Sequence, residues 1–138
     1  MGLLVFASAG LGLEALHGLK LPLYLDVSNE TRRLMWTLGH AHGTLLSVVN
    51  VLFAVSLRAF PGTASANRTV ISASLLGAMV LLPLGFFAGG LFVYAGDPNP
   101  SVLAVPFGAV LLLIALLLMA RGARSAPGDS GRSSPTRR

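Results

Sequence analysis

The sequence has no cysteine and few charged residues. Asp, Glu, Lys and Arg make up 11% of its 138 residues, whereas a soluble domain has about 25%. The missing cysteines exclude disulfides, thiolate metal sites and a cysteine nucleophile. With so few charged residues, the chain cannot form the polar surface of a soluble protein, so we expect it to lie in a membrane.

Three long stretches carry no charged residue: 34–57, 69–96 and 98–120. Crossing the hydrocarbon core takes roughly 20 helical residues, so each stretch is long enough to span it. A fourth apolar segment, 2–21, also has the length, although it carries Glu14 and Lys20. It lacks the basic start and cleavage site of a signal peptide. The pattern predicts an all-α integral membrane protein, an antiparallel four-transmembrane-helix bundle.

The predicted transmembrane domain covers 1–121, with helices at about 2–21, 34–57, 69–95 and 101–120. The remaining residues, 122–138, are rich in Gly, Ser, Pro and Arg, a composition that predicts a disordered basic tail. Because basic residues gather on cytoplasmic flanks, Arg58, Arg68 and the arginines after position 120 place both termini in the cytoplasm. We expect a multi-pass protein of the cell inner membrane.

The net charge of +5 follows from this topology and predicts no nucleic-acid partner. The partners that we expect are the lipid bilayer and either another membrane protein or a second copy of the chain.

The predicted helix 34–57 has two unlike faces. At 100° per residue, its small and polar residues share one arc: Gly39, Asn50, Gly43, Trp36, Ser47, His40 and Thr44. The opposite arc is apolar: Leu45, Leu38, Val49, Met35, Phe53 and Leu46. His42 falls on this apolar arc. We therefore expect His40 to face the bundle interior and His42 to contact lipid headgroups or a neighbouring helix.

Small residues recur on one stripe of each of the first three predicted helices. Such residues let helices approach closely in lipid, where no hydrophobic force drives them together. The glycines expected at helix contacts are Gly10, Gly18, Gly39, Gly43, Gly85 and Gly89.

Counting residues from the outer ends of the first two helices places Glu14, His17, His40 and Thr44 in one polar layer. Ionisable residues inside a membrane are costly and are candidates for function. Two interpretations stay open: hydrogen bonds between helices, or a site for a proton, ligand or cofactor. Glu14 is the only carboxylate in the predicted helices, which excludes a di-iron site, since that needs several.

The chain resembles the transmembrane protein 256-like family, small four-helix membrane proteins of unknown function. Its first helix typically ends in A-H-G-L-K, similar to Leu16-His17-Gly18-Leu19-Lys20; its second carries Y-H-A-L, similar to 39–42, GHAH. Its F-x-G-S-L-Y and P-x-G-G motifs are similar to 87–92, FAGGLF, and 106–109, PFGA. The resemblance covers roughly 8–120 and implies a fold and a membrane location but no activity. Glu14 stands where the family has an apolar residue.

The sequence carries no nucleophile–base set, phosphate loop or nucleotide fingerprint, so we predict that it is not an enzyme. The leading hypothesis is a small membrane protein that acts by packing, alone or beside a larger complex, without a cofactor. One alternative is haem b or a metal held by His17 and His40. Another is a pathway for protons or a small solute through Glu14, His17 and His40.

Overall fold

A computed structural model describes residues 1–25, 30–59 and 67–124, and these are mostly helical. Its elements in chain order are α1 (Gly2–Gly18), α2 (Pro22–Leu25), α3 (Glu30–Ala59), α4 (Arg68–Gly89), β1 (Val93–Tyr94), β2 (Asp97–Pro98), the 3-10 helix η1 (Pro100–Leu103) and α5 (Ala104–Arg124).

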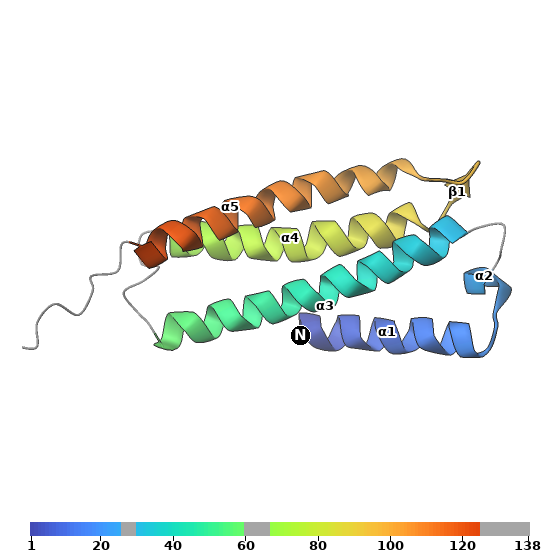
Figure 1. Ribbon diagram of the computed structural model, residues 1–138, viewed down its shortest axis with the longest axis horizontal. Helices are drawn as coiled ribbons and strands as arrows, with labels where there is room; N and C mark the ends of the chain where they lie inside the picture. Colours follow the sequence, from blue (N-terminus) through green and yellow to red (C-terminus); the bar gives the residue numbers. More distant parts are fainter. Residues whose placement is uncertain (26–29, 60–66, 125–138) are drawn as a thin grey trace, which may run out of the picture.

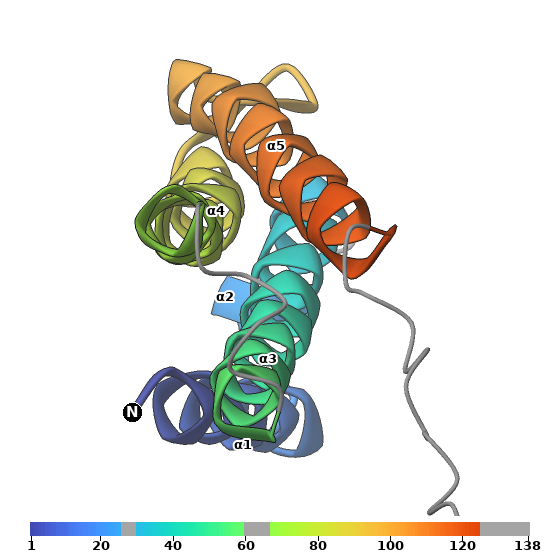
Figure 2. The ribbon, with the colours of Figure 1, turned by 90° about the vertical axis from the view of Figure 1, so that its left-hand side faces the viewer.

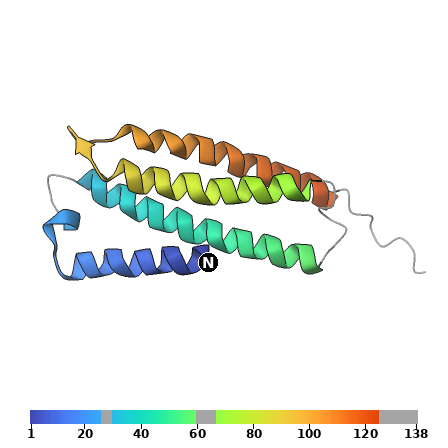
Figure 3. The ribbon, with the colours of Figure 1, turned by 180° about the vertical axis from the view of Figure 1, so that it is seen from behind.

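The long helices lie side by side, and each runs opposite to the next in the order α1, α3, α4, α5 (Figure 1). In the end-on view, α3 lies between α1 on one side and the α4–α5 pair on the other (Figure 2). The view from behind shows that α1 lies along only one half of α3 (Figure 3). The central position of α3 gives it packing neighbours on two sides.

Three helices are long and apolar enough to cross a membrane: α3, α4 and the continuous segment Pro100–Arg124 that contains α5. The helix α1 has 17 residues, about 25 Å at 1.5 Å per residue, which is shorter than the hydrocarbon core of about 30 Å. Its first turn lies beside Ser47, since a Cβ on Gly2 would be 2.7 Å from the Ser47 Oγ. The structure therefore shows three candidate spans and a shorter apolar helix, rather than four equal ones.

The end of α1 differs from the predicted one near residue 21. The Lys20 backbone has a φ of 51°, and the Leu21 amide donates to the Leu16 carbonyl at 3.1 Å while the Lys20 amide donates to that of His17 at 3.0 Å. Two such bonds around a left-handed residue form the Schellman motif that ends many helices, and the left-handed residue in this motif is usually glycine. The helix α1 thus stops at Gly18, before Pro22 could end it.

Two other predicted boundaries are also corrected. The helix α3 begins at Glu30, four residues before the predicted start, with Glu30 paired to Arg33 at 3.8 Å. The helix α4 ends at Gly89, not near 95, because the chain enters a two-stranded hairpin. Ala95 and Gly96 both have positive φ and form the two-residue turn between Tyr94 and Asp97, as a right-twisted hairpin favours.

The predicted tail also begins later than expected. Its first residues, 122–124, belong to α5, and 125–138 lie outside the described residues.

The apolar core lies among α3, α4 and α5. One cluster, near the end of α3, consists of Phe53, Ile71, Leu75 and Ala115. A second, in the middle, consists of Leu46, Ala78 and Leu82. No residue of α1 is buried within the described part of the chain. The helix α1 is therefore a peripheral element held on the surface of α3.

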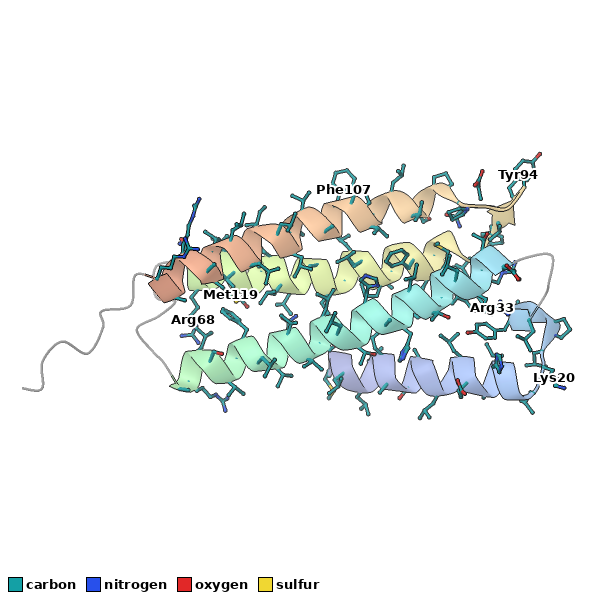
Figure 4. The ribbon with its side chains drawn as sticks, in the orientation of Figure 1. Lys20, Arg33, Arg68, Tyr94, Phe107 and Met119 are labelled. Atoms are coloured by element: carbon teal, nitrogen blue, oxygen red, sulfur yellow. The ribbon has the colours of Figure 1, made fainter. Side chains whose placement is uncertain are left out.

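Most of the charged residues that the structure describes lie near one of the two ends of the molecule. Arg68 lies at the end of the molecule opposite to Lys20, Arg33 and Tyr94 (Figure 4). Arg58 at the end of α3 and Arg121 and Arg124 at the end of α5 share the end of Arg68, because these helices alternate in direction. We call it the basic end.

Candidate functional site

The contact between α1 and α3 depends on two glycines that face two rings. A Cβ on Gly10 would lie 2.3 Å from the His40 Cε1, and a Cβ on Gly43 would lie 2.2 Å from the Phe6 Cδ1. Both distances are far below a van der Waals contact. Each helix thus supplies a glycine that accepts an aromatic ring of the other, and any side chain there would push α1 away from α3.

His40 is fixed in this contact by a hydrogen bond. Its Nδ1 lies 2.8 Å from the Phe6 carbonyl oxygen, and a carbonyl only accepts, so Nδ1 carries the proton. In the neutral ring, Nε2 then holds the lone pair and can accept a hydrogen bond or bind a ligand. The bond to α1 therefore both orients the imidazole and sets its tautomer.

A groove of about 610 Å³, lined by both polar and apolar residues, lies along this contact. We call it the Glu14 groove; its lining residues are Ala7, Gly10, Leu11, Leu13, Glu14, Tyr24, Thr37, His40 and Thr44. The Tyr24 hydroxyl lies 3.3 Å from the Thr37 Oγ1. The Thr44 Oγ1 is buried and has no hydrogen-bond partner among the described residues. The structure thus brings three of the four predicted layer residues, Glu14, His40 and Thr44, to one groove.

His17 is not among the residues that line the Glu14 groove. Its ring meets the edge of Tyr24 at a centroid distance of 6.3 Å, and Tyr24 in turn stacks on Trp36 at 6.4 Å. His40 is level with Gly10, seven residues before His17 on α1, which is about 10 Å along the axis. His17 and His40 are therefore not brought together as a facing pair.

His42 lies at the opposite edge of the buried face of α3. Its Nδ1 is 2.8 Å from the Leu38 carbonyl oxygen of its own helix, and its ring packs on Phe86 of α4 with centroids 5.0 Å apart. Leu46 and Phe53, on the same apolar arc, are buried. The apolar arc of α3 thus also packs on a helix: His40 faces α1, and His42 contacts α4, which is one of the two contacts expected for it.

Five of the six glycines expected at helix contacts lie against another part of the chain, and Gly18 does not. Besides Gly10 and Gly43, a Cβ on Gly39 would lie 2.8 Å from Phe87, on Gly85 2.9 Å from Val105, and on Gly89 3.2 Å from Val102. Gly18 has no heavy atom of the described residues within 4 Å of that position, because it lies at the end of α1. Gly18 is thus not a packing position.

Two further grooves flank α3. The Trp36 groove, of about 680 Å³, lies between α1 and α4 and is apolar; its lining residues are Ala9, Gly12, Leu13, Leu16, Trp36, Leu84, Phe87, Ala88 and Leu91. The Trp36 Nε1 donates to the Phe87 carbonyl at 3.2 Å, which ties α3 to α4 at its floor.

The other groove lies beyond the start of α1, toward the basic end. We call it the arginine trough. It has a volume of about 510 Å³, and its lining residues are Met1, Gly2, Leu3, Ser47, Asn50, Val51, Phe53, Ala54, Leu57, Arg58, Arg68, Ser72, Leu76 and Met79. Sequence reasoning missed it, because it exists only where α1 leaves α3 and α4 uncovered, and α1 was expected to extend over their full length.

Within the described residues, no group of three or more His, Asp or Glu side chains is arranged to hold a metal ion. No protein-family model, curated protein or solved structure matches the sequence.

Proposed function

We propose that the chain is a non-enzymatic integral membrane protein of the cell inner membrane that acts by packing against another membrane protein. The spans α3, α4 and α5 support the membrane placement. The arginines at the basic end support a cytoplasmic position for that end, with 125–138 following α5 on the same side. The N-terminal end of α1 points the same way, so that α1 is the fourth membrane helix of an antiparallel bundle.

The Glu14 groove carries this proposal. Glu14 makes no hydrogen bond or ion pair with the described residues, the Thr44 Oγ1 is buried without a described partner, and the His40 Nε2 is left free by the bond at Nδ1. Polar groups without partners at membrane depth cost several kcal/mol. A helix that brings polar side chains to this groove removes that cost.

The chemistry of the groove specifies the partner helix. The Glu14 carboxylate and the His40 Nε2 both accept hydrogen bonds, so the partner has to present donors, such as an amide, a hydroxyl or a cationic side chain, at their depth. Gly10 and Ala7 beside them leave room for its backbone to approach.

The test is the size of the complex extracted in a mild detergent from the native membrane. We expect Glu14→Leu to release the chain from a complex that the wild type and Glu14→Gln retain, because the amide still forms hydrogen bonds. Glu30→Gln is the matched control, since Glu30 pairs with Arg33 at the outer end. A wild-type chain that runs as a monomer, or Glu14→Leu in an undiminished complex, refutes the proposal.

The two alternatives have less support in the geometry. Haem b with axial His17 and His40 needs facing imidazoles, whereas the His17 ring packs on Tyr24 and lies about 10 Å along α1 from the level of His40. A proton pathway needs hydrogen-bonded groups in sequence, whereas Ser47 and Asn50, next along α3, donate to Gly43 and Leu46 of their own helix. A Soret band in the purified protein, lost in either His17→Ala or His40→Ala, would favour haem instead.

We also propose membership of the transmembrane protein 256-like family. The support is the order and spacing of the motifs around His17, His40, Gly89 and Pro106.

A further inference from the structure

The arginine trough has the form of a site for an amphiphile. It begins where α1 begins, beside Ser47, and continues along α3 to Arg58, eleven residues or about 16 Å further. That length is close to half of a hydrocarbon core of about 30 Å, the depth of one leaflet. Its floor is formed by apolar residues, among them Ala54, Leu57 and Leu76.

The mouth of the trough is positively charged. Arg58 at the end of α3 and Arg68 at the start of α4 both line it, and neither makes a hydrogen bond or ion pair with the described residues. Asn67 makes no side-chain cap, so the first amides of α4 add their partial positive charge beside Arg68. None of the residues lining the trough is Asp or Glu. The mouth is therefore complementary to an anion.

We propose that the arginine trough binds one anionic phospholipid of the cytoplasmic leaflet. Its phosphate lies between Arg58 and Arg68, with Ser72, one turn from Arg68, as a further hydrogen-bond donor, and an acyl chain fills the apolar floor as far as α1. Charge complementarity at the mouth and an apolar floor of leaflet depth together select this ligand over a soluble anion. The inference rests on the proposed membrane placement but not on a partner at the Glu14 groove.

The test is native mass spectrometry of the full chain in detergent, titrated with dioleoyl phosphatidylglycerol or dioleoyl phosphatidylcholine. We expect the wild type to retain one phosphatidylglycerol in preference to phosphatidylcholine. Arg58→Gln and Arg68→Gln should each weaken binding about fivefold, as expected for one cation at a membrane surface. Arg124→Gln, which removes the same charge at the same end outside the trough, is the control and should have no such effect.

A second pair of measurements separates the trough from general attraction to a basic surface. Ala54→Trp fills the floor without a change in charge and should also displace the lipid, while the deacylated headgroup glycerophosphoglycerol should not compete. An equal loss in Arg124→Gln, unchanged binding in Ala54→Trp, or competition by the free headgroup would each overturn the site. Glu14→Leu should bind the lipid normally, so failure of the partner proposal stays distinguishable.

Discussion

Replacing Gly10 by alanine tests the contact that holds α1 on α3. The added Cβ would lie 2.3 Å from the His40 Cε1 and 2.8 Å from both ring nitrogens, so the imidazole has to leave or α1 has to move. Overpacking of this kind costs about 1–3 kcal/mol, and loss of the His40–Phe6 hydrogen bond adds roughly 0.6 kcal/mol. Better helix propensity returns up to about 1 kcal/mol. We expect a net loss of roughly 0.6–2.6 kcal/mol.

Gly12 supplies the matched control, because no described heavy atom lies within 4 Å of its Cβ position. Gly12→Ala, two residues away on the same helix, should therefore be neutral or stabilising by up to about 1 kcal/mol. Reversible unfolding in mixed micelles measures both variants. The fluorescence of Trp36, the single tryptophan, provides the signal, because Tyr24 stacks on its ring beside α1.

A double-mutant cycle decides whether the imidazole is the cause. In a His40→Ala background the three nearest atoms to the new Cβ are gone, so Gly10→Ala should cost nothing there, which gives a coupling of roughly 0.6–2.6 kcal/mol. Equal stability of Gly10→Ala and Gly12→Ala, or a loss that persists without His40, would refute the reasoning.

Two further predictions concern the end of α1 and the topology. Lys20→Gly should stabilise the protein by about 1 kcal/mol, because Lys20 holds a left-handed φ of 51° that glycine adopts freely; the same unfolding assay measures it, and a loss of stability would contradict the Schellman ending. In this cysteine-free chain, Tyr94→Cys and Ser130→Cys should react with a membrane-impermeant thiol reagent from opposite sides; reaction from the same side would exclude the proposed orientation.

The long helices could be predicted from the sequence because charge-free stretches of span length have few alternatives. Some of their ends could not, because they depend on local backbone geometry that the residue types do not indicate. Lys20 has a left-handed backbone conformation at a position where glycine is usual, and Ala95 has the same conformation in the hairpin turn. Neither residue type marks a helix end in a sequence.

The polar layer was predicted only in part, for a geometric reason. Depth was counted from helix ends, but α1 ends one residue after His17 while α3 begins ten residues before His40, an offset of roughly 13 Å at 1.5 Å per residue. Glu14 and His40 line the same groove nonetheless, because Gly10 lets the imidazole reach α1. For His42 the sequence left open a lipid headgroup or a neighbouring helix, because the pattern of one helix does not show that α4 packs on its apolar arc.

The hydrogen bonds between elements have a mechanical consequence. At the end opposite to the basic end, the Thr31 hydroxyl donates to the Gly96 carbonyl at 2.6 Å, and the Arg32 guanidinium donates to the Gly90 carbonyl at 3.2 Å. These two bonds fix the start of α3 to the hairpin and to the end of α4. Toward the basic end, α3 and α4 meet mainly through the apolar side chains of Phe53, Ile71 and Leu75, where the Asn50 Nδ2 donates to the Leu75 carbonyl over a longer distance of 3.5 Å. The shorter hydrogen bonds between α3 and the α4–hairpin region thus gather at the end away from the basic end, so we expect the two helices to separate at the basic end before they separate at the hairpin.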